Sequence, residues 1–548
     1  MSQSRPRIAV FSGPTATIQN SAPLVTGAQA RERHGLPPLC APRRFDLLRP
    51  QRLAKPVVVY VEAFSAHPLE RDAQALYAPP DGYLDAEGEF HQQRTSPDDV
   101  AVYEVELRPE DGLYLLPYMA RRIAGGAWEA ATVVPDSDFG NIRQTFYPDA
   151  SRIFEEMDRF GLDVDGRNNI LSRLADFDFV RAAPSAGQTG EGETHGRDFF
   201  AYSPPHLARA PSLSTLAALT TTVQECLDTG RYDGAIWLEG SGHIEETVYW
   251  LNLLIDTPVP LCGNAAQRPH GTLSADGARN IVGSVLYIGS RVWADGDGDD
   301  MVGAVLVQDE RVFSAREVAK EDARPGGFVA SGGQGGVVAA IGATDTPTLT
   351  FVPSARHTFG SEVNLHRLPE RVVGVTGTPS RPVPTTVRVK GDGGELLPKA
   401  MPMVRITKNA RYAPHSWDTD AESEVEVGAR VRLNLSSFPL AGFVLEGSAP
   451  YGDGDSVLTA ALRRAVFCGM PVVRVGRGNV GGAVPPDPAG VFLGGSNLTA
   501  TKARLLLMAC LMRFGGPPPA RDPDNPTPAE LDAISGHMDK FKLVFATH

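Results

Sequence analysis

Short apolar runs alternate with longer amphipathic segments along much of the chain. Residues 7–12 form an apolar run that is closed by Gly13 and Pro14, and residues 235–238 form another. Buried strands that alternate with helices are typical of a parallel sheet covered by helices on both faces. We therefore predict a doubly wound α/β domain. Its further elements are predicted at residues 56–61 and 258–262 (strands), 213–227, 245–255 and 276–287 (helices), and 301–308 with 311–314 (a hairpin).

Two regions depart from this alternation. Residues 66–205 contain acidic segments with proline and glycine, but also enough apolar and aromatic residues for ordered structure, so we expect an inserted subdomain. Residues 346–400 are rich in proline and glycine with short β-like runs, which is typical of a linker that contains a hairpin. The predicted organisation is an N-terminal domain over residues 1–345, this linker, and a smaller C-terminal α/β domain over residues 401–548.

Composition and charge narrow the class of protein. A chain of 548 residues is too long for one hydrophobic core, so we expect two or more domains. Its net charge is −13 and it has no dense Lys/Arg run, so we expect no nucleic-acid partner. The five cysteines are odd in number and widely spaced, which favours free thiols in a reducing, cytoplasmic compartment. No apolar stretch has membrane-spanning length, and no cluster of ligands indicates a metal or an organic cofactor.

The most informative segment is residues 232–249, with the sequence YDGAIWLEGSGHIEETVY. A strand ends there at a glycine elbow, Ser241 follows at the bend, and an amphipathic helix comes next. Open α/β proteins bind their ligands at the carboxyl edge of the sheet, where such a turn lies. We therefore expect Ser241 to lie at a functional site.

This segment resembles the second catalytic segment of the type I/II asparaginase family, in which His-Gly-Thr-Asp-Thr precedes a Glu-Glu-Thr helix start. The resemblance implies that Ser241 replaces the family's second catalytic threonine and that Gly240 supplies the elbow. Residues 302–323 resemble the family's lysine segment, which places Lys320 at the lysine position. A lysine buried beside hydroxyl groups would have a lowered pKa and could act as a base. The C-terminal GGSNLTATKAR run is similar to the family as well.

The family's nucleophile loop, Gly-Gly-Thr-Ile, corresponds to residues 12–18 of this chain, SGPTATI. Two threonines are candidates for the nucleophile. Thr17 is followed by Ile18 and preceded by Ala16, whose backbone N–H remains available to stabilise an oxyanion. Thr15 keeps the Gly-x-Thr spacing but follows Pro14, which has no N–H to donate. Thr17 is favoured, and Thr15 remains the alternative.

The chain differs from the family where the substrate is bound. The aspartate that holds the substrate's ammonium group in the family is Gly242 here. Its candidate replacements are Glu239 and His243, and also Glu245 and Glu246, although carboxylates in a first helical turn are favoured by the helix dipole in any case. Either Ser65 or Ser212 would take the place of the serine with which the family binds the substrate carboxylate.

The resemblance implies an amidohydrolase that cleaves a small-molecule carboxamide through a threonine nucleophile, most simply asparagine to aspartate and ammonia. One alternative is an amidase of the same fold that acts on a larger or non-zwitterionic amide or lactam. A second is a binding protein that kept the fold and lost the chemistry. The family also implies a homodimer or homotetramer, in which the loop of residues 447–455 would meet a neighbouring subunit's site.

Overall fold

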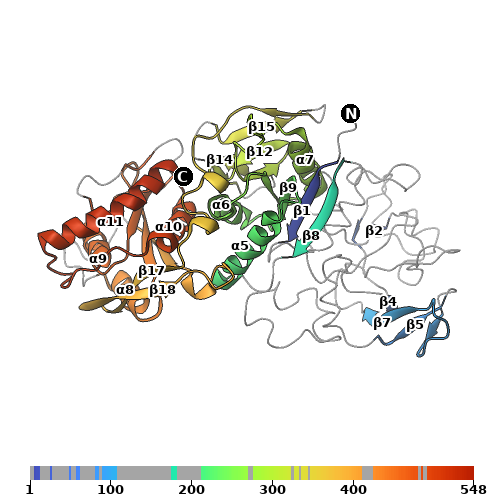
Figure 1. Ribbon diagram of the computed structural model, residues 1–548, viewed down its shortest axis with the longest axis horizontal. Helices are drawn as coiled ribbons and strands as arrows, with labels where there is room; N and C mark the ends of the chain where they lie inside the picture. The colour runs from blue at the N-terminus through green and yellow to red at the C-terminus, as the bar shows by residue number, and fades with distance from the viewer. Residues whose placement is uncertain are drawn as a thin grey trace, which may run out of the picture.

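The computed structural model comprises two α/β domains, an N-terminal one around a large sheet and a C-terminal one around a smaller sheet (Figure 1). All statements about structure below refer to the residues that it describes. These are residues 5–12, 25–26, 49–50, 57–61, 80–85, 89–107, 174–181, 212–268, 276–322, 326–331, 335–342, 346–409, 424–478, 483–485 and 490–548.

The N-terminal domain is built on an eight-stranded sheet with the order β16-β15-β12-β11-β10-β9-β1-β8. The pairings from β8 through β11 are parallel, and those from β11 through β16 are antiparallel. The predicted α/β class with a mostly parallel sheet is therefore confirmed. The strands are β1 (Arg7–Ser12), β8 (Asp176–Arg181), β9 (Gly234–Leu238), β10 (Leu261–Asn264), β11 (Val305–Gln308), β12 (Arg311–Ser314), β15 (Val337–Ile341) and β16 (Pro347–Leu349).

Helices cover both faces of this sheet. Alternate side chains of β1 and β9 point to opposite faces, so Phe11 and Trp237 belong to one core cluster while Val10 and Ile236 belong to another. The first cluster contains α5 (Leu213–Asp228) and α6 (Ile244–Leu254), and the second contains α7 (Gly277–Ser290). The connection between each strand and its helix lies at the carboxyl edge of the parallel strands.

The place of β8 in the sheet differs from the prediction. The expected strand at residues 56–61 forms as β4 (Val57–Val61), but it pairs antiparallel with β7 (Val100–Leu107) in a separate sheet. The position beside β1 belongs instead to β8, from the region expected to be an insertion. Either β4 or β8 could pair with β1, and the other strand would still have a partner. The local sequence therefore does not indicate which of the two strands lies beside β1. The smaller strands of this region are β2 (Val25–Thr26), β3 (Arg49–Pro50), β5 (Gly82–Leu84) and β6 (Phe90–His91).

Residues between the two domains form a hairpin and short helical turns. The strands β17 (Arg371–Thr378) and β18 (Arg381–Arg388) pair as an antiparallel hairpin. Within the N-terminal domain, a further hairpin between β12 and β15, formed by β13 (Val318–Lys320) and β14 (Phe328–Ala330), lies beside α6. The short turns are η4 (Thr358–Gly360), η5 (Leu365–Arg367) and η6 (Pro398–Ala400).

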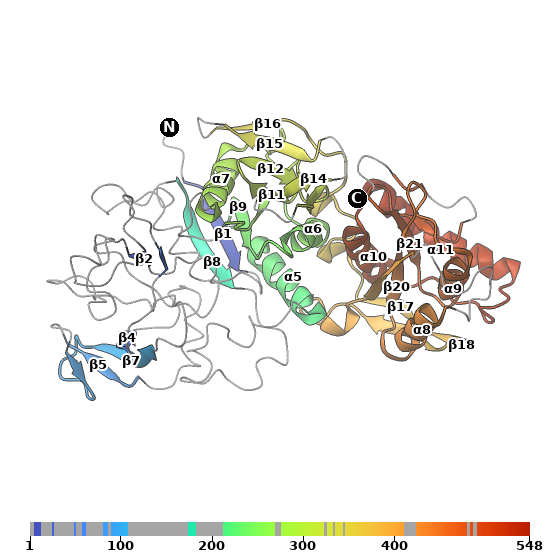
Figure 2. The same cartoon turned by 180° about the vertical axis from the view of Figure 1, so that it is seen from behind.

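The C-terminal domain has a four-stranded parallel sheet with four helices. The helix α10 (Ala500–Phe514) packs on its own sheet and also against α6 of the N-terminal domain, so both domains contribute to one continuous hydrophobic cluster (Figure 2). The other elements are β19 (Met403–Lys408), α8 (Val425–Ser437), β20 (Ala441–Gly447), α9 (Ser456–Phe467), β21 (Val472–Gly476), β22 (Leu493–Gly494) and α11 (Pro528–Thr547).

Candidate active site

The predicted glycine elbow forms between β9 and α6. The carbonyl oxygen of Gly240 accepts hydrogen bonds from the backbone N–H groups of His243 at 3.1 Å and Ile244 at 3.3 Å. This tight turn directs the chain from the strand into the helix, with Ser241 at its apex. Ser241 is half-buried, whereas Gly242 and His243 are exposed. The turn therefore presents a hydroxyl group at the carboxyl edge of the sheet.

Glu239 does not reach the exposed side of the elbow. Its side chain is buried, and one carboxylate oxygen accepts a hydrogen bond from Nε1 of Trp237 at 2.9 Å. Trp237 is itself fully buried and packs near the ring of Phe11. Among the predicted replacements for the family's aspartate, Glu239 is thus held within the core beneath the turn.

Lys320 lies at the end of β13 and is attached to the start of α6. Its backbone N–H donates a hydrogen bond to the carboxylate of Glu245, in the first turn of that helix. Its Nζ donates to Oε1 of Gln267 and lies 5.3 Å from the centroid of the Phe328 ring. Burial raises the pKa of the Glu245 carboxyl. Two segments far apart in sequence, those of Ser241 and Lys320, are therefore joined through Glu245.

Gln267 is held in turn by buried Asp276. The carboxylate of Asp276 accepts hydrogen bonds from the backbone N–H groups of Gln267 at 3.0 Å and Arg268 at 2.8 Å. Its other oxygen accepts from Nε2 of Gln308 at 2.6 Å. Asn280 extends this network by donating to Gln308 at 3.0 Å. These side chains fix the loop that binds Nζ of Lys320, and the sequence analysis assigned them no role.

A second lysine, Lys502 on α10, supports the segment that precedes Lys320. Lys502 is 1% exposed, and its Nζ donates hydrogen bonds to the carbonyl oxygens of Ala315 at 2.8 Å, Arg316 at 2.9 Å and Val318. Burial lowers its pKa to about 8, so the amine is protonated at neutral pH and has one proton for each carbonyl. The GGSNLTATKAR run that contains this residue therefore has a definite structural role.

The other predicted site residues divide into two groups. Ser212 caps the N-terminus of α5, where its Oγ accepts from the backbone N–H of Thr215 at 3.1 Å. His243 precedes α6 without a side-chain capping bond. Thr15, Thr17 and Ser65 lie outside the described residues. The strand before Ser65, β4, is not part of the main sheet.

The loop predicted to contact a neighbouring subunit follows β20. An isolated bridge joins Ser448 to Asp453, and Arg474 pairs with Asp453 at 2.8 Å. Tyr451 at the tip is 60% exposed. Within the part of the chain that the structure describes, no helix combines the length and the apolar character needed to cross a bilayer.

Part of the chain matches a known family of sequences. Residues 205–344, which contain Ser212, the elbow and Lys320, match the family described as Asparaginase, N-terminal. A glutaminase-asparaginase of Pseudomonas fluorescens biotype A is 24% identical over 305 residues, which is 54% of this chain and 69% of that protein. An L-asparaginase of Bacillus licheniformis is 34% identical over 105 residues, or 19% of this chain and 31% of that protein.

A solved structure shows a weaker overall similarity. The probable cytoplasmic L-asparaginase from Campylobacter jejuni superimposes with a TM-score of 0.45 at 19% sequence identity. The aligned part is 69% of this chain and 93% of that one.

Proposed function

We propose that this chain is a member of the asparaginase family and an amidohydrolase that cleaves the C–N bond of a small-molecule carboxamide. The observation that supports the proposal most directly is the attachment of Lys320 to the helix that follows Ser241. Glu245 binds the backbone of Lys320, and Gln267 binds its ammonium group. A hydroxyl and a lysine amine within reach of each other can form a proton relay, and we propose this role for Ser241 and Lys320.

In the proposed reaction, a threonine of the first loop attacks the carbonyl carbon of the amide. Thr17 is the preferred nucleophile, and Thr15 is the alternative. Backbone N–H groups of that loop would stabilise the oxyanion, and ammonia or an amine would leave. Ser241 and Lys320 would move the proton that activates first the threonine and then the water that hydrolyses the acyl-enzyme.

The proposed substrate is asparagine, and a specific observation favours a second candidate. Gly242 supplies no carboxylate to bind an α-ammonium group, and Glu239 is bound within the core. An amidase for a larger or non-zwitterionic amide needs neither group. Rates of ammonia release from asparagine, glutamine and succinamate, which lacks the α-amino group, distinguish the two candidates.

A lysine substitution tests the proposal. We expect Lys320→Met to reduce ammonia release by at least about 1,000-fold, because the relay loses its base. Lys540→Met is the matched control, since Lys540 is exposed on α11, and it should leave the rate unchanged. Thermal unfolding of both variants would show whether they are folded. A folded Lys320→Met protein with the wild-type rate would refute the proposed relay and favour a different base.

We also propose that the chain assembles as a homodimer or homotetramer through the loop of residues 447–455. Tyr451 gives the exposed tip of that loop a large side chain that a second subunit could cover. Light scattering of the wild-type protein and of Tyr451→Ala would test this, and a wild-type monomer would contradict it.

A further inference from the structure

A cavity of about 610 Å³ lies where the two domains meet. The N-terminal domain contributes the first turns of α5 and α6 to its wall, and the C-terminal domain contributes β19, α8 and α10. Cavities that bind small molecules in proteins are of this size, roughly 300 to 1,000 Å³. A ligand bound here would contact both domains at once.

The wall of the cavity carries an excess of positive charge. Arg405, Arg430 and Arg504 line it, and among the described lining residues Glu246 provides the only carboxylate. Arg430 is also paired with Glu426 of the same helix, so Arg405 and Arg504 carry most of the excess. Glu246 lies 3.9 Å from Nη2 of Arg504, a separation that leaves the pair weak. The Nε atoms of Arg405 and Arg504 are buried, and within the described part of the chain they have no hydrogen-bond partner. Buried donors of this kind normally have an acceptor.

Two helix N-termini lie at the cavity. The helix α5 begins at Leu213, and α6 begins at Ile244, and residues of both first turns line the cavity. The N-terminal end of a helix carries a partial positive charge that favours anions. The first turn of α6 already carries Glu245 and Glu246, so the end of α5 is the one that acts in the same direction as the guanidinium groups.

Most of the remaining wall is apolar, and Ser212, His243 and Thr247 are its other polar residues. Its large apolar side chains come from both domains. They are Leu216, Trp250, Met403, Ile406 and Met508. A ligand that fits the whole cavity has both a charged group and a hydrophobic body.

We propose that this interdomain cavity binds an organic anion that carries a carboxylate or phosphate group on an apolar body. The anionic group is bound by Arg405 and Arg504, whose planar guanidinium groups can each donate two hydrogen bonds to it. The apolar body packs against Trp250 and Met403. Ser241 and Lys320 do not line the cavity, whereas Ser212, His243 and Glu246 do, so the cavity adjoins the proposed substrate site without containing its proton relay.

Calorimetric titration of the full chain with three probes tests the proposal. The probes are 4-phenylbutyrate, phenyl phosphate, and the uncharged 4-phenylbutanol. We expect at least one anion to bind with a Kd below about 1 mM, and the alcohol to bind at least ten-fold more weakly. The relative affinities of the two anions show whether the cavity prefers a carboxylate or a phosphate.

Substitutions then locate the bound anion. Arg405→Gln and Arg504→Gln should each weaken binding of that anion by at least ten-fold. Arg432→Gln should change it less than two-fold, because Arg432 is exposed on the same helix as Arg430 and does not line the cavity. Arg405→Lys keeps the positive charge and should retain part of the affinity. This variant can still be measured if the glutamine variants fold poorly. Equal binding of the alcohol, no binding of either anion, or equal losses in Arg432→Gln and Arg405→Gln would overturn the proposal.

Discussion

A Cβ atom built on Gly242 meets no other atom within 4 Å, so a side chain fits there without displacing its neighbours. The family's aspartate can therefore be restored by Gly242→Asp. We expect this variant to increase kcat/KM for asparagine relative to succinamate by about ten-fold or more, because an ion-paired hydrogen bond to the α-ammonium group contributes about 1.5–3 kcal/mol. Steady-state ammonia release from both amides measures the change.

Gly242→Asn serves as the control for this experiment, since asparagine has the shape of aspartate without its charge. It should leave the ratio of the two kcat/KM values close to that of the wild type. Should Gly242→Asp leave the ratio unchanged as well, the α-ammonium group of asparagine does not lie near this position.

Lys502 illustrates how much one buried residue can contribute to the free energy of unfolding. Three carbonyl groups accept hydrogen bonds from its Nζ, and Lys502→Met would leave all three without that donor. We expect a loss of at least about 3 kcal/mol in the free energy of unfolding, since each buried unsatisfied polar group costs about 1–3 kcal/mol. Urea denaturation measures it, with Lys540→Met as the exposed control. A loss below 1 kcal/mol would mean that water or another donor replaces the lysine.

At the scale of single elements, α11 has a clear N-terminal signal. Oγ1 of Thr527 accepts from the backbone N–H of Glu530 at 3.4 Å, and the Glu530 carboxylate accepts from the backbone N–H of Thr527 at 2.8 Å, which together form a capping box. We expect Thr527→Ala to lower the free energy of unfolding by about 1 kcal/mol. Thr527→Ser keeps the hydroxyl group and should retain most of the stability that the cap contributes. Equal losses in both variants would show that the methyl group matters rather than the cap.

Elements whose signals are local could be predicted from the sequence. The predicted helix at residues 245–255 differs from α6 by one residue at each end, because its apolar spacing and its preceding glycine turn are both local features. The position of β8 in the sheet could not be predicted in the same way. Parallel pairing of β8 with β1 depends on contacts between segments more than 160 residues apart, and β4 (VVVYV) was a more apolar candidate than β8 (DFDFVR).

The same limit applies to the candidate site. The elbow around Ser241 followed from a local pattern, and the structure shows the turn that was expected. The partners of Lys320 did not follow from a local pattern, since Glu245 and Gln267 precede Lys320 in the chain by 75 and 53 residues. In the sequence, Glu245 was already explained by the helix dipole, which favours a carboxylate in a first helical turn. Its bond to the Lys320 backbone depends on how β13 packs against α6.

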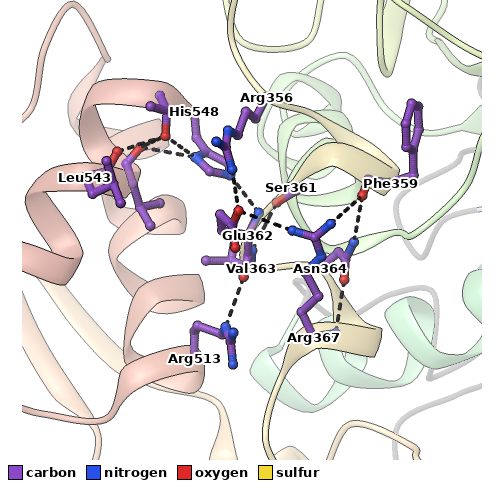
Figure 3. Close-up of polar contacts among 12 residues, drawn as sticks. Arg356, Phe359, Ser361, Glu362, Val363, Asn364, Arg367, Arg513, Leu543 and His548 are labelled. Carbon is purple, nitrogen blue, oxygen red and sulfur yellow. Dashed lines mark hydrogen bonds and ion pairs between the residues drawn. The ribbon is translucent and has the colours of Figure 1, made fainter.

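At the scale of the whole molecule, His548 at the end of α11 contacts the linker between the domains (Figure 3). Nε2 of His548 accepts a hydrogen bond from the backbone N–H of Glu362 at 2.9 Å, and Nδ1 lies 3.2 Å from the carbonyl oxygen of Val544. This arrangement needs a neutral imidazole. Burial is the main cause that lowers the pKa of His548 from 6.5 to about 4.

The unfolded chain therefore takes up this proton at a higher pH than the folded chain does. The stabilisation is fully present above pH 6.5, is lost as the pH falls toward 4, and amounts to about 3 kcal/mol. We expect His548→Gln to lose less stability than the wild type between pH 7 and pH 4.5, as measured by urea denaturation at both values. An unchanged pH dependence in the variant would assign the acid sensitivity to other groups.

The contacts around residues 315–320 have a consequence for protein synthesis. Nε of Arg316 donates to the carbonyl oxygen of His548 at 2.9 Å, Nη1 of Arg316 donates to Asn497 at 2.7 Å, and Lys502 binds three carbonyls of the same segment. All of these partners leave the ribosome more than 170 residues after Lys320. A nascent chain that has emerged only as far as residue 400 lacks every one of them, so the lysine segment is completed late, when the C-terminal domain folds against it.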